Sequence, residues 1–246
     1  MDSVTSSDVK EEARRLGFSL VGIAAAEGLK NLPSGDVSGV LTLNRIADEL
    51  PTARSAIILG YHAFDPALNL AVDARLVGSQ RPEGRSEWHQ LYAEIVKTKA
   101  WQMVNYLIER GFDAIPSLSI ALKPAAVIAG LGCRGKNTLL VTPEYGSKVR
   151  FVAVLTSAKL EPDEPFAKDL CNDCKRCIDA CPTGALKPHE IDIRRCLTYA
   201  AESPGSADVE EDVRALERKL IRRPTPGSYI ECTICIEACP IGRKKR

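Results

Sequence analysis

The chain has 246 residues, with 33 basic and 32 acidic side chains and a formal net charge of +1. Its length allows one large domain or two modest ones. The balanced charge argues against a protein built to bind nucleic acid or an acidic membrane, and no stretch approaches the ~18 apolar residues of a membrane span.

The first half of the chain alternates helical and extended patterns. Residues 6–17 combine a capping signal with helix formers and end at Gly17, which predicts a helix. Apolar runs at 18–24 and 55–61 predict strands. Residues 87–110 have helical periodicity up to Gly111, whereas residues 63–85 predict an irregular segment.

Further along, residues 114–120, 138–142 and 151–156 have the composition of strands. A turn at residues 143–147 predicts that the last two of these strands pair with each other. Glu161-Pro-Asp-Glu-Pro165 has the composition of a linker. We therefore predict two domains, residues 1–160 and 161–246, the second with a helical spacer at residues 208–222.

Eight of the nine cysteines fall into two related motifs. Cys171, Cys174, Cys177 and Cys181 follow the C-x2-C-x2-C-x3-C-P spacing of bacterial ferredoxins. The second half contains the remaining four, which are Cys196, Cys232, Cys235 and Cys239, the last again before a proline. The pattern predicts two 4Fe–4S clusters, and hence a one-electron protein.

The cysteine before proline typically binds the other cluster of a two-cluster module. We therefore assign to the first cluster Cys171, Cys174, Cys177 and Cys239. The second cluster then has the ligands Cys181, Cys196, Cys232 and Cys235. The alternatives fit less well, because structural zinc prefers separated cysteine pairs and disulfides suit small secreted chains.

The compartment follows from the same cysteines. The first residues, Met1-Asp-Ser-Val-Thr-Ser-Ser-Asp, lack the basic and apolar regions of a signal peptide. Free cysteines in this number need a reducing environment. We expect a cytoplasmic protein.

A glycine-rich turn, Gly130-Leu-Gly-Cys-Arg-Gly-Lys-Asn137, matches the G-x4-G-K part of a phosphate-binding loop. Asn137 stands where that loop needs a serine or threonine for magnesium, and a strand pattern follows instead of a helix. ATP binding is therefore not expected. Two interpretations stay open: a tight turn that needs positive φ, and a bare backbone surface for a large flat cofactor.

The stretch from Ala129 to Val141, AGLGCRGKNTLLV, resembles the signature of epoxyqueuosine reductases. The next stretch, TPEYGSKVR up to Arg150, is similar to the related reductive dehalogenases. The segment Asp192–Tyr199 around Cys196 resembles both. This superfamily combines cobalamin with two 4Fe–4S clusters.

The resemblance implies an α+β protein, in which a nitroreductase-like α/β cofactor-binding domain precedes a two-cluster ferredoxin-like domain. It implies a cobalamin-dependent reductase that passes electrons from an external donor through both clusters to a corrinoid and then to a substrate. The residues that it places around the corrinoid are Gly130, Leu131, Gly132, Cys133, Gly135, Lys136 and Asn137.

The resemblance expects a catalytic aspartate as proton donor at the position where this chain has Pro116. Asp113 is the nearest carboxylate and becomes one candidate acid. Tyr145 is a second candidate, with a packing role as its alternative. Cys133, the ninth cysteine, is either a small core residue or a contact of the cofactor.

Two functions remain after these observations. The first is the cobalamin-dependent reductase, with ferredoxin or flavodoxin as donor, an unidentified substrate and no membrane association. The alternative is an electron-transfer protein that reduces the cofactor of a partner protein. A tRNA substrate is possible but is not favoured by the balanced charge.

Overall fold

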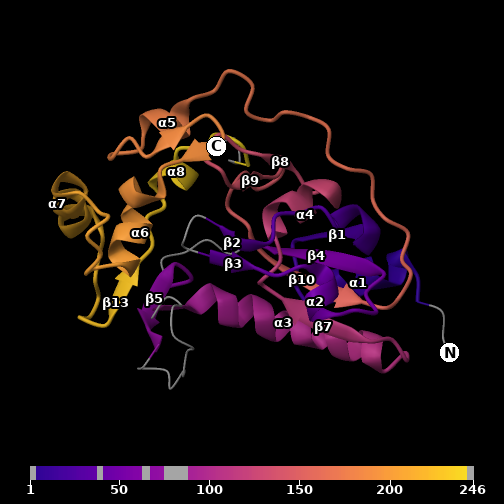
Figure 1. The fold of residues 1–246 in the computed structure, drawn as a ribbon. Coiled ribbons are helices and arrows are strands. Elements are labelled where there is room, and N and C mark those ends of the chain that lie inside the picture. The colour runs from indigo at the N-terminus through magenta and orange to yellow at the C-terminus, as the bar shows by residue number, and fades with distance from the viewer. Residues whose placement is uncertain (1–3, 38–40, 63–66, 75–87, 243–246) are drawn as a thin grey trace. The chain divides into compact units, whose positions relative to one another are not determined.

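The computed structural model describes residues 4–37, 41–62, 67–74 and 88–242. The chain forms two compact units that interleave along the sequence (Figure 1). Unit 1 comprises residues 1–63, 95–134 and 149–169, and unit 2 comprises residues 64–94, 135–148 and 170–246. These units differ in outline from the predicted domains 1–160 and 161–246, whose separate folding stays a prediction.

Unit 1 is built on an antiparallel sheet with the strand order β1-β4-β10-β7. The strands are β1 (Leu20–Ala25), β4 (Ser55–Tyr61), β7 (Ala114–Ser117) and β10 (Arg150–Thr156). β4 coincides with the apolar run that predicted a buried strand. The predicted pairing of residues 138–142 with 151–156 is wrong, because β10 pairs with β4 and β7.

Helices cover both faces of this sheet. The longer helices are α1 (Ser6–Arg15), α3 (Leu91–Ile108) and α4 (Leu122–Ile128). α3 begins later than predicted, because Trp88–Gln90 form a strand. The short elements of unit 1 are the 3₁₀ helix η1 (Ala26–Leu29), α2 (Ile46–Glu49), β2 (Gly35–Val37), β3 (Leu41–Leu43) and β8 (Cys133–Arg134).

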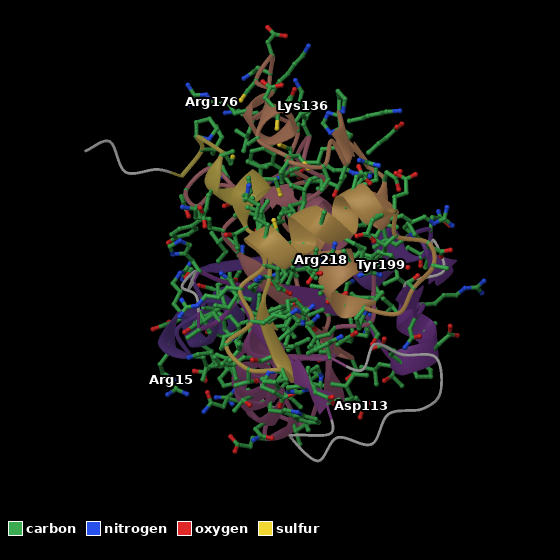
Figure 2. All side chains as sticks on the ribbon, turned by 90° about the vertical axis from the view of Figure 1, so that its left-hand side faces the viewer. Arg15, Asp113, Lys136, Arg176, Tyr199 and Arg218 are labelled. Atoms are coloured by element: carbon green, nitrogen blue, oxygen red, sulfur yellow. The ribbon has the colours of Figure 1, made fainter. Side chains whose placement is uncertain are left out.

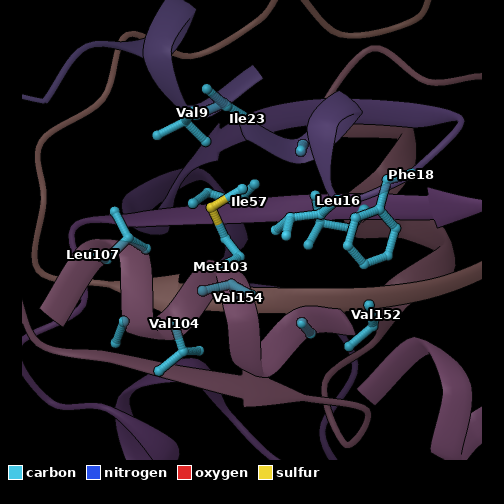
Figure 3. Packing of buried hydrophobic residues seen from close by; sticks show 14 of the residues in the cluster. Val9, Leu16, Phe18, Ile23, Ile57, Met103, Val104, Leu107, Val152 and Val154 are labelled. Atoms are coloured by element: carbon cyan, nitrogen blue, oxygen red, sulfur yellow. The ribbon is translucent and has the colours of Figure 1, made fainter. Parts of the chain in front are cut away.

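The main core of unit 1 lies between the sheet and the helices α1 and α3 (Figure 3). Val9 of α1 and Met103 of α3 contribute to the same buried cluster as Ile57 of β4. α4 packs on the opposite face, where Gly22 of β1 leaves no room for a Cβ beside Ala129. A strand covered on both faces is apolar throughout, which explains the continuous apolar run of β4.

Glycine ends the two long helices of unit 1 as the sequence predicts. Gly17 follows α1 with φ 83°, and Gly111 follows α3 with φ 85°. In both, the residue after the glycine donates its N–H to the carbonyl five residues back, Phe18 to Ala13 and Phe112 to Leu107. This is the Schellman cap, which glycine favours because it adopts positive φ without strain.

The predicted linker is an ordered strap of unit 1. The main chain of Asp163 donates its N–H to the carbonyl of Ile23, and its carboxylate accepts from the Ile23 N–H at 2.9 Å. The same carboxylate pairs with Lys10. These contacts hold the segment against the edge strand β1.

Unit 2 contains the cysteine motifs. Its strands are β5 (Leu70–Asp73), β6 (Trp88–Gln90), β9 (Leu140–Val141), β11 (Leu186–Lys187), β12 (Glu190–Ile191) and β13 (Ser228–Ile230). Its helices are α5 (Arg176–Asp179), η3 (Ile193–Arg195), α6 (Leu197–Glu202), α7 (Glu211–Leu220) and α8 (Ile234–Glu237). α7 lies within the predicted helical spacer. Across the described residues, no helix is long and apolar enough to span a membrane.

A three-stranded sheet, β13-β5-β6, joins distant parts of the sequence within unit 2. β5 falls in the segment predicted to be irregular, most of which lies outside the described residues. Trp88 and Tyr229 meet edge to face, with ring centroids 5.0 Å apart. Trp88 donates to the carbonyl of Glu202, and the Tyr229 hydroxyl donates to its carboxylate, each at 2.8 Å. Cys232 packs against this cluster.

Candidate iron–sulfur site

The structure brings together the four cysteines assigned to the first cluster. Cys171, Cys174 and Cys177 of the first motif line one cavity with Cys239 of the second. α5 carries Cys177 and packs against α8, which ends just before Cys239. Local backbone structure places three of these sulfurs, and the packing of two short helices supplies the fourth.

The second group is recognised from the electrostatic effects among its members. Burial, followed by the charge of Cys232, raises the pKa of Cys235 to about 12. The pKa of Cys232 rises to about 11, mainly by burial and also through Cys196 and Cys181. The charge of Cys181, which belongs to the first motif in sequence, therefore reaches the members of the second group.

The first group shows the same separation. Burial raises the pKa of Cys177, and the charges that raise it further are those of Cys171 and Cys239. The charge of Cys177 has the smallest of the effects that raise the pKa of Cys235. The crossed assignment of ligands to the two clusters stays a prediction.

Both groups are suited to a metal centre in their chemistry. Thiolates are the ligands of iron–sulfur clusters, and cluster binding must displace the thiol protons. Within the described residues, no three His, Cys, Asp or Glu side chains stand close enough to hold a single metal ion.

Hydrogen bonds around the second group were not predicted from the sequence. The Thr183 hydroxyl lies 3.5 Å from the Cys181 sulfur, and Arg195 donates to the Thr183 carbonyl at 2.9 Å. Backbone N–H groups of Tyr199 and Thr198, at the start of α6, lower the pKa of Cys196 against the larger effect of its burial. Buried threonines close to cysteines are the signal that could have identified these contacts.

The glycine-rich turn divides between the two units. In unit 1, Gly130 has φ 76° and caps α4, with the N–H of Leu131 donating to Ala126 at 2.9 Å. A Cβ at Gly130 would lie 2.7 Å from the carbonyl oxygen of Glu164. Gly132 is buried and Cys133 is half-buried. The tight-turn interpretation therefore accounts for Gly130.

The end of the turn belongs to unit 2 and faces the first cysteine group. Lys136 and Asn137 line the same cavity as Cys171. Asn137 is buried, and its side-chain amide donates to the Ser147 hydroxyl at 3.2 Å. A Cβ at Gly135 would lie 2.5 Å from a methyl group of Val141, so packing also explains this glycine.

The two candidate acids have different surroundings. Asp113, labelled in Figure 2, is an exposed residue before β7 whose carboxylate accepts from the Thr52 hydroxyl at 2.9 Å. Tyr145 is half-buried in a turn of unit 2, where its N–H donates to the Thr142 hydroxyl at 3.2 Å. Pro116 lies within β7, opposite Val154. A catalytic role for either acid stays a prediction.

Comparison with known proteins agrees with this geometry. Residues 170–242 match the family model of a 4Fe-4S double cluster binding domain. An epoxyqueuosine reductase from a Synechococcus strain is 31% identical over 96% of this chain and 75% of its own length. The chain belongs to the epoxyqueuosine reductase family. The family is named for an oxidoreductase activity, and its Gloeobacter violaceus member is 29% identical over 96% of this chain and 76% of its own.

Solved structures of the family share the fold. The epoxyqueuosine reductase of Streptococcus thermophilus has a TM-score of 0.69 at 21% identity, and covers 97% of this chain and 66% of its own. The Bacillus subtilis enzyme has a TM-score of 0.68 at 23% identity, and this chain spans 65% of its length. A catabolic reductive dehalogenase has a TM-score of 0.61 at 18% identity, with 32% of its chain covered. The nitroreductase-like description of the first part stays a prediction.

Proposed function

We propose that the protein is a reductase that takes electrons from an external low-potential donor through two 4Fe–4S clusters and a corrinoid to a substrate. The observation that carries this proposal is the separation of eight cysteines into two groups across both motifs. Membership of the epoxyqueuosine reductase family supports it. The wild-type ligands of each cluster are those predicted from the crossed spacing.

The proposal that this chain binds a corrinoid is supported more by the family than by the local geometry of the turn. A related dehalogenase structure is described in terms of B12-dependent dehalogenation. In this chain, packing within each unit accounts for Gly130 and Gly135 without any ligand. When bound, a corrinoid would supply a cobalt centre that donates electrons to a substrate. Its proposed contacts remain the turn residues, chiefly Gly132, Cys133 and Lys136.

For the proton, Tyr145 and Asp113 remain the proposed donors. Tyr145 belongs to the same unit as both cysteine groups. Asp113 belongs to unit 1, where its carboxylate accepts a hydrogen bond from the Thr52 hydroxyl at 2.9 Å. The variants Asp113→Asn and Tyr145→Phe each remove one candidate acid with little change of shape. Turnover should fall only in the variant that lacks the proton donor.

The substrate to test first is a tRNA that carries epoxyqueuosine. One epoxyqueuosine reductase structure with a TM-score of 0.67 contains an epoxyqueuosine-modified tRNA stem loop. This observation favours a tRNA substrate, although the balanced charge of the sequence does not. We propose ferredoxin or flavodoxin as the donor and the cytoplasm as the compartment.

The alternative function is electron delivery to a partner protein. The observation that favours it is Pro116, which occupies the place where the resemblance expects a catalytic aspartate. A protein without its own substrate needs no proton donor at that place.

An anaerobic binding experiment tests the proposal. The purified protein, reconstituted with iron and sulfide, is mixed with cobalamin and passed through a gel-filtration column, and the eluate is followed by ultraviolet–visible spectroscopy. We expect the iron of two clusters and a co-eluting corrinoid in equimolar amount. Two clusters without retained corrinoid would contradict the reductase and favour the electron-transfer alternative. Absence of clusters would contradict both.

A further inference from the structure

The segment Gly135–Lys148, here called the bracket, belongs to unit 2 although it lies more than twenty residues ahead of the first cysteine motif. It contacts the first cysteine group in two places. Lys136 lies at one of them, and Gly146 lies at the other. Lys136 and Arg176 of α5 are found at the same end of unit 2 (Figure 2).

At the first place, the Lys136 ammonium donates to the carbonyl of Asn172. Asn172 stands between two predicted ligands, Cys171 and Cys174, and has a φ of 42°. Positive φ is uncommon outside glycine. The lysine therefore holds an irregular loop at the point where the loop must present two sulfurs to one cluster.

At the second place, the turn around Gly146 meets the chain that follows Cys239. A Cβ at Gly146 would collide with the carbonyl oxygen of Ile241 and would lie 3.6 Å from the Cys239 sulfur. A Cβ at Gly242 would collide with the backbone of Tyr145. The bracket thus contacts both parts of the first cysteine group, the loop of the first motif and Cys239 of the second.

The charge of Lys136 is the part of the bracket with an electronic consequence. The side chain lines the cavity of the first cysteine group and is only half-exposed. Among the ion pairs between described residues, none involves Lys136. A nearby positive charge favours the reduced, more negative state of a cluster, and net charge and hydrogen bonding are established controls of cluster potential.

We propose that Lys136 raises the reduction potential of the first cluster above the value that its four thiolates alone would give. The residue acts through its charge beside the ligand loop. This makes it a determinant of electron flow within the proposed reductase, a role different from contact with a corrinoid. The proposal rests on the two-cluster function proposed above.

Two variants separate charge from hydrogen bonding. Lys136→Gln keeps an N–H donor for the Asn172 carbonyl but removes the charge, and Lys136→Arg keeps both. Lys187, an exposed lysine of β11 outside the cavity lining, provides the matched control Lys187→Gln. Each protein is reconstituted anaerobically without corrinoid or substrate, and its iron content is assayed. The reduction potentials of its clusters are then measured by a redox titration followed by electron paramagnetic resonance.

We expect Lys136→Gln to lower one of the two cluster potentials and to leave the other unchanged. Lys136→Arg and Lys187→Gln should keep both potentials near those of the wild type. An unshifted potential in Lys136→Gln with full iron content would overturn the proposal. Loss of iron from Lys136→Gln alone would also overturn it, because the residue would then be a structural tether. A wild-type protein without clusters would instead contradict the proposed function.

Discussion

The two cysteine groups are each built from members of both cysteine motifs, but they differ in the residues that surround them. The first is contacted by the bracket, with the cation of Lys136 and the close backbone approach of Gly146. The second lies beside the aromatic cluster of Trp88 and Tyr229 and receives backbone N–H groups from the start of α6. Ligand spacing therefore defines which clusters form, and the surroundings must set how they differ in stability and potential.

The largest effect is expected from removing a ligand that is crossed in sequence. Cys181→Ala deletes a cysteine of the first motif that the crossed assignment gives to the second group, whose members Cys232 and Cys235 feel its charge. We expect the iron content to fall by about half. The electron paramagnetic resonance signal of the second cluster should disappear. Cys239→Ala is the reciprocal control and should remove the first cluster. Loss of the same cluster in both variants would contradict the crossed assignment.

The aromatic cluster should matter next, and for the second group in particular. Trp88→Ala removes a side chain that is 8% exposed and its hydrogen bond to Glu202. We expect a loss of about 3–5 kcal/mol in the free energy of unfolding, measured by denaturant titration of the reconstituted protein.

Trp101→Ala is the control for that loss, because Trp101 is 46% exposed on α3. It should change stability by about 0.5 kcal/mol or less. Equal losses in the two variants would mean that the aromatic cluster contributes no more than exposed surface does.

The bracket should show its contribution in a smaller effect. Gly146→Ala and Gly184→Ala each place alanine at positive φ, at 57° and 64°, with a strain of about 1–2 kcal/mol. Only Gly146 also meets neighbouring backbone, whereas a Cβ at Gly184 has no atom within 4 Å. We expect the Gly146 variant to lose about 1–3 kcal/mol more in the free energy of unfolding than the Gly184 variant. It should also lose iron from the first cluster.

The two thermal melting curves measure this difference directly, since the strain of positive φ is common to both variants. Identical melting temperatures and iron contents would show that the bracket does not position Cys239.

The smallest effect concerns the hydroxyl beside the second group. Thr183→Val keeps the shape of the side chain but removes its hydrogen bond to the Cys181 sulfur. Hydrogen bonds to cluster sulfurs stabilise the reduced state, so we expect a modest lowering of the second potential in the same redox titration. A shift of the first potential instead would contradict the assignment of Cys181.

Local structure could be predicted well wherever neighbours in sequence decide it. The glycine caps at Gly17 and Gly111 and the buried strand β4 follow from φ preferences and from apolar runs. The helix α4 was missed because it is short and contains Pro124 near its start. The strand Trp88–Gln90 was included in a helix because three residues carry too little periodicity to be recognised.

The candidate site was predicted unevenly for the same reason. Cysteine spacing is a local property, and the prediction of eight ligands rests on it alone. The surroundings of those ligands were not identified: Lys136 was assigned to a cofactor turn, and Thr183 was not singled out. Whether the turn also contacts a corrinoid stays a prediction.

The sequence by itself determined the two cysteine motifs and the family, because cysteine spacing and signature residues are properties of continuous stretches of the chain. Only the tertiary structure decided that β5 pairs with β13, that residues 161–165 pack against β1, and that the bracket contacts the first cysteine group. These contacts join segments far apart in the chain. Their free energy comes from backbone pairing and packing at close range, which no local pattern encodes.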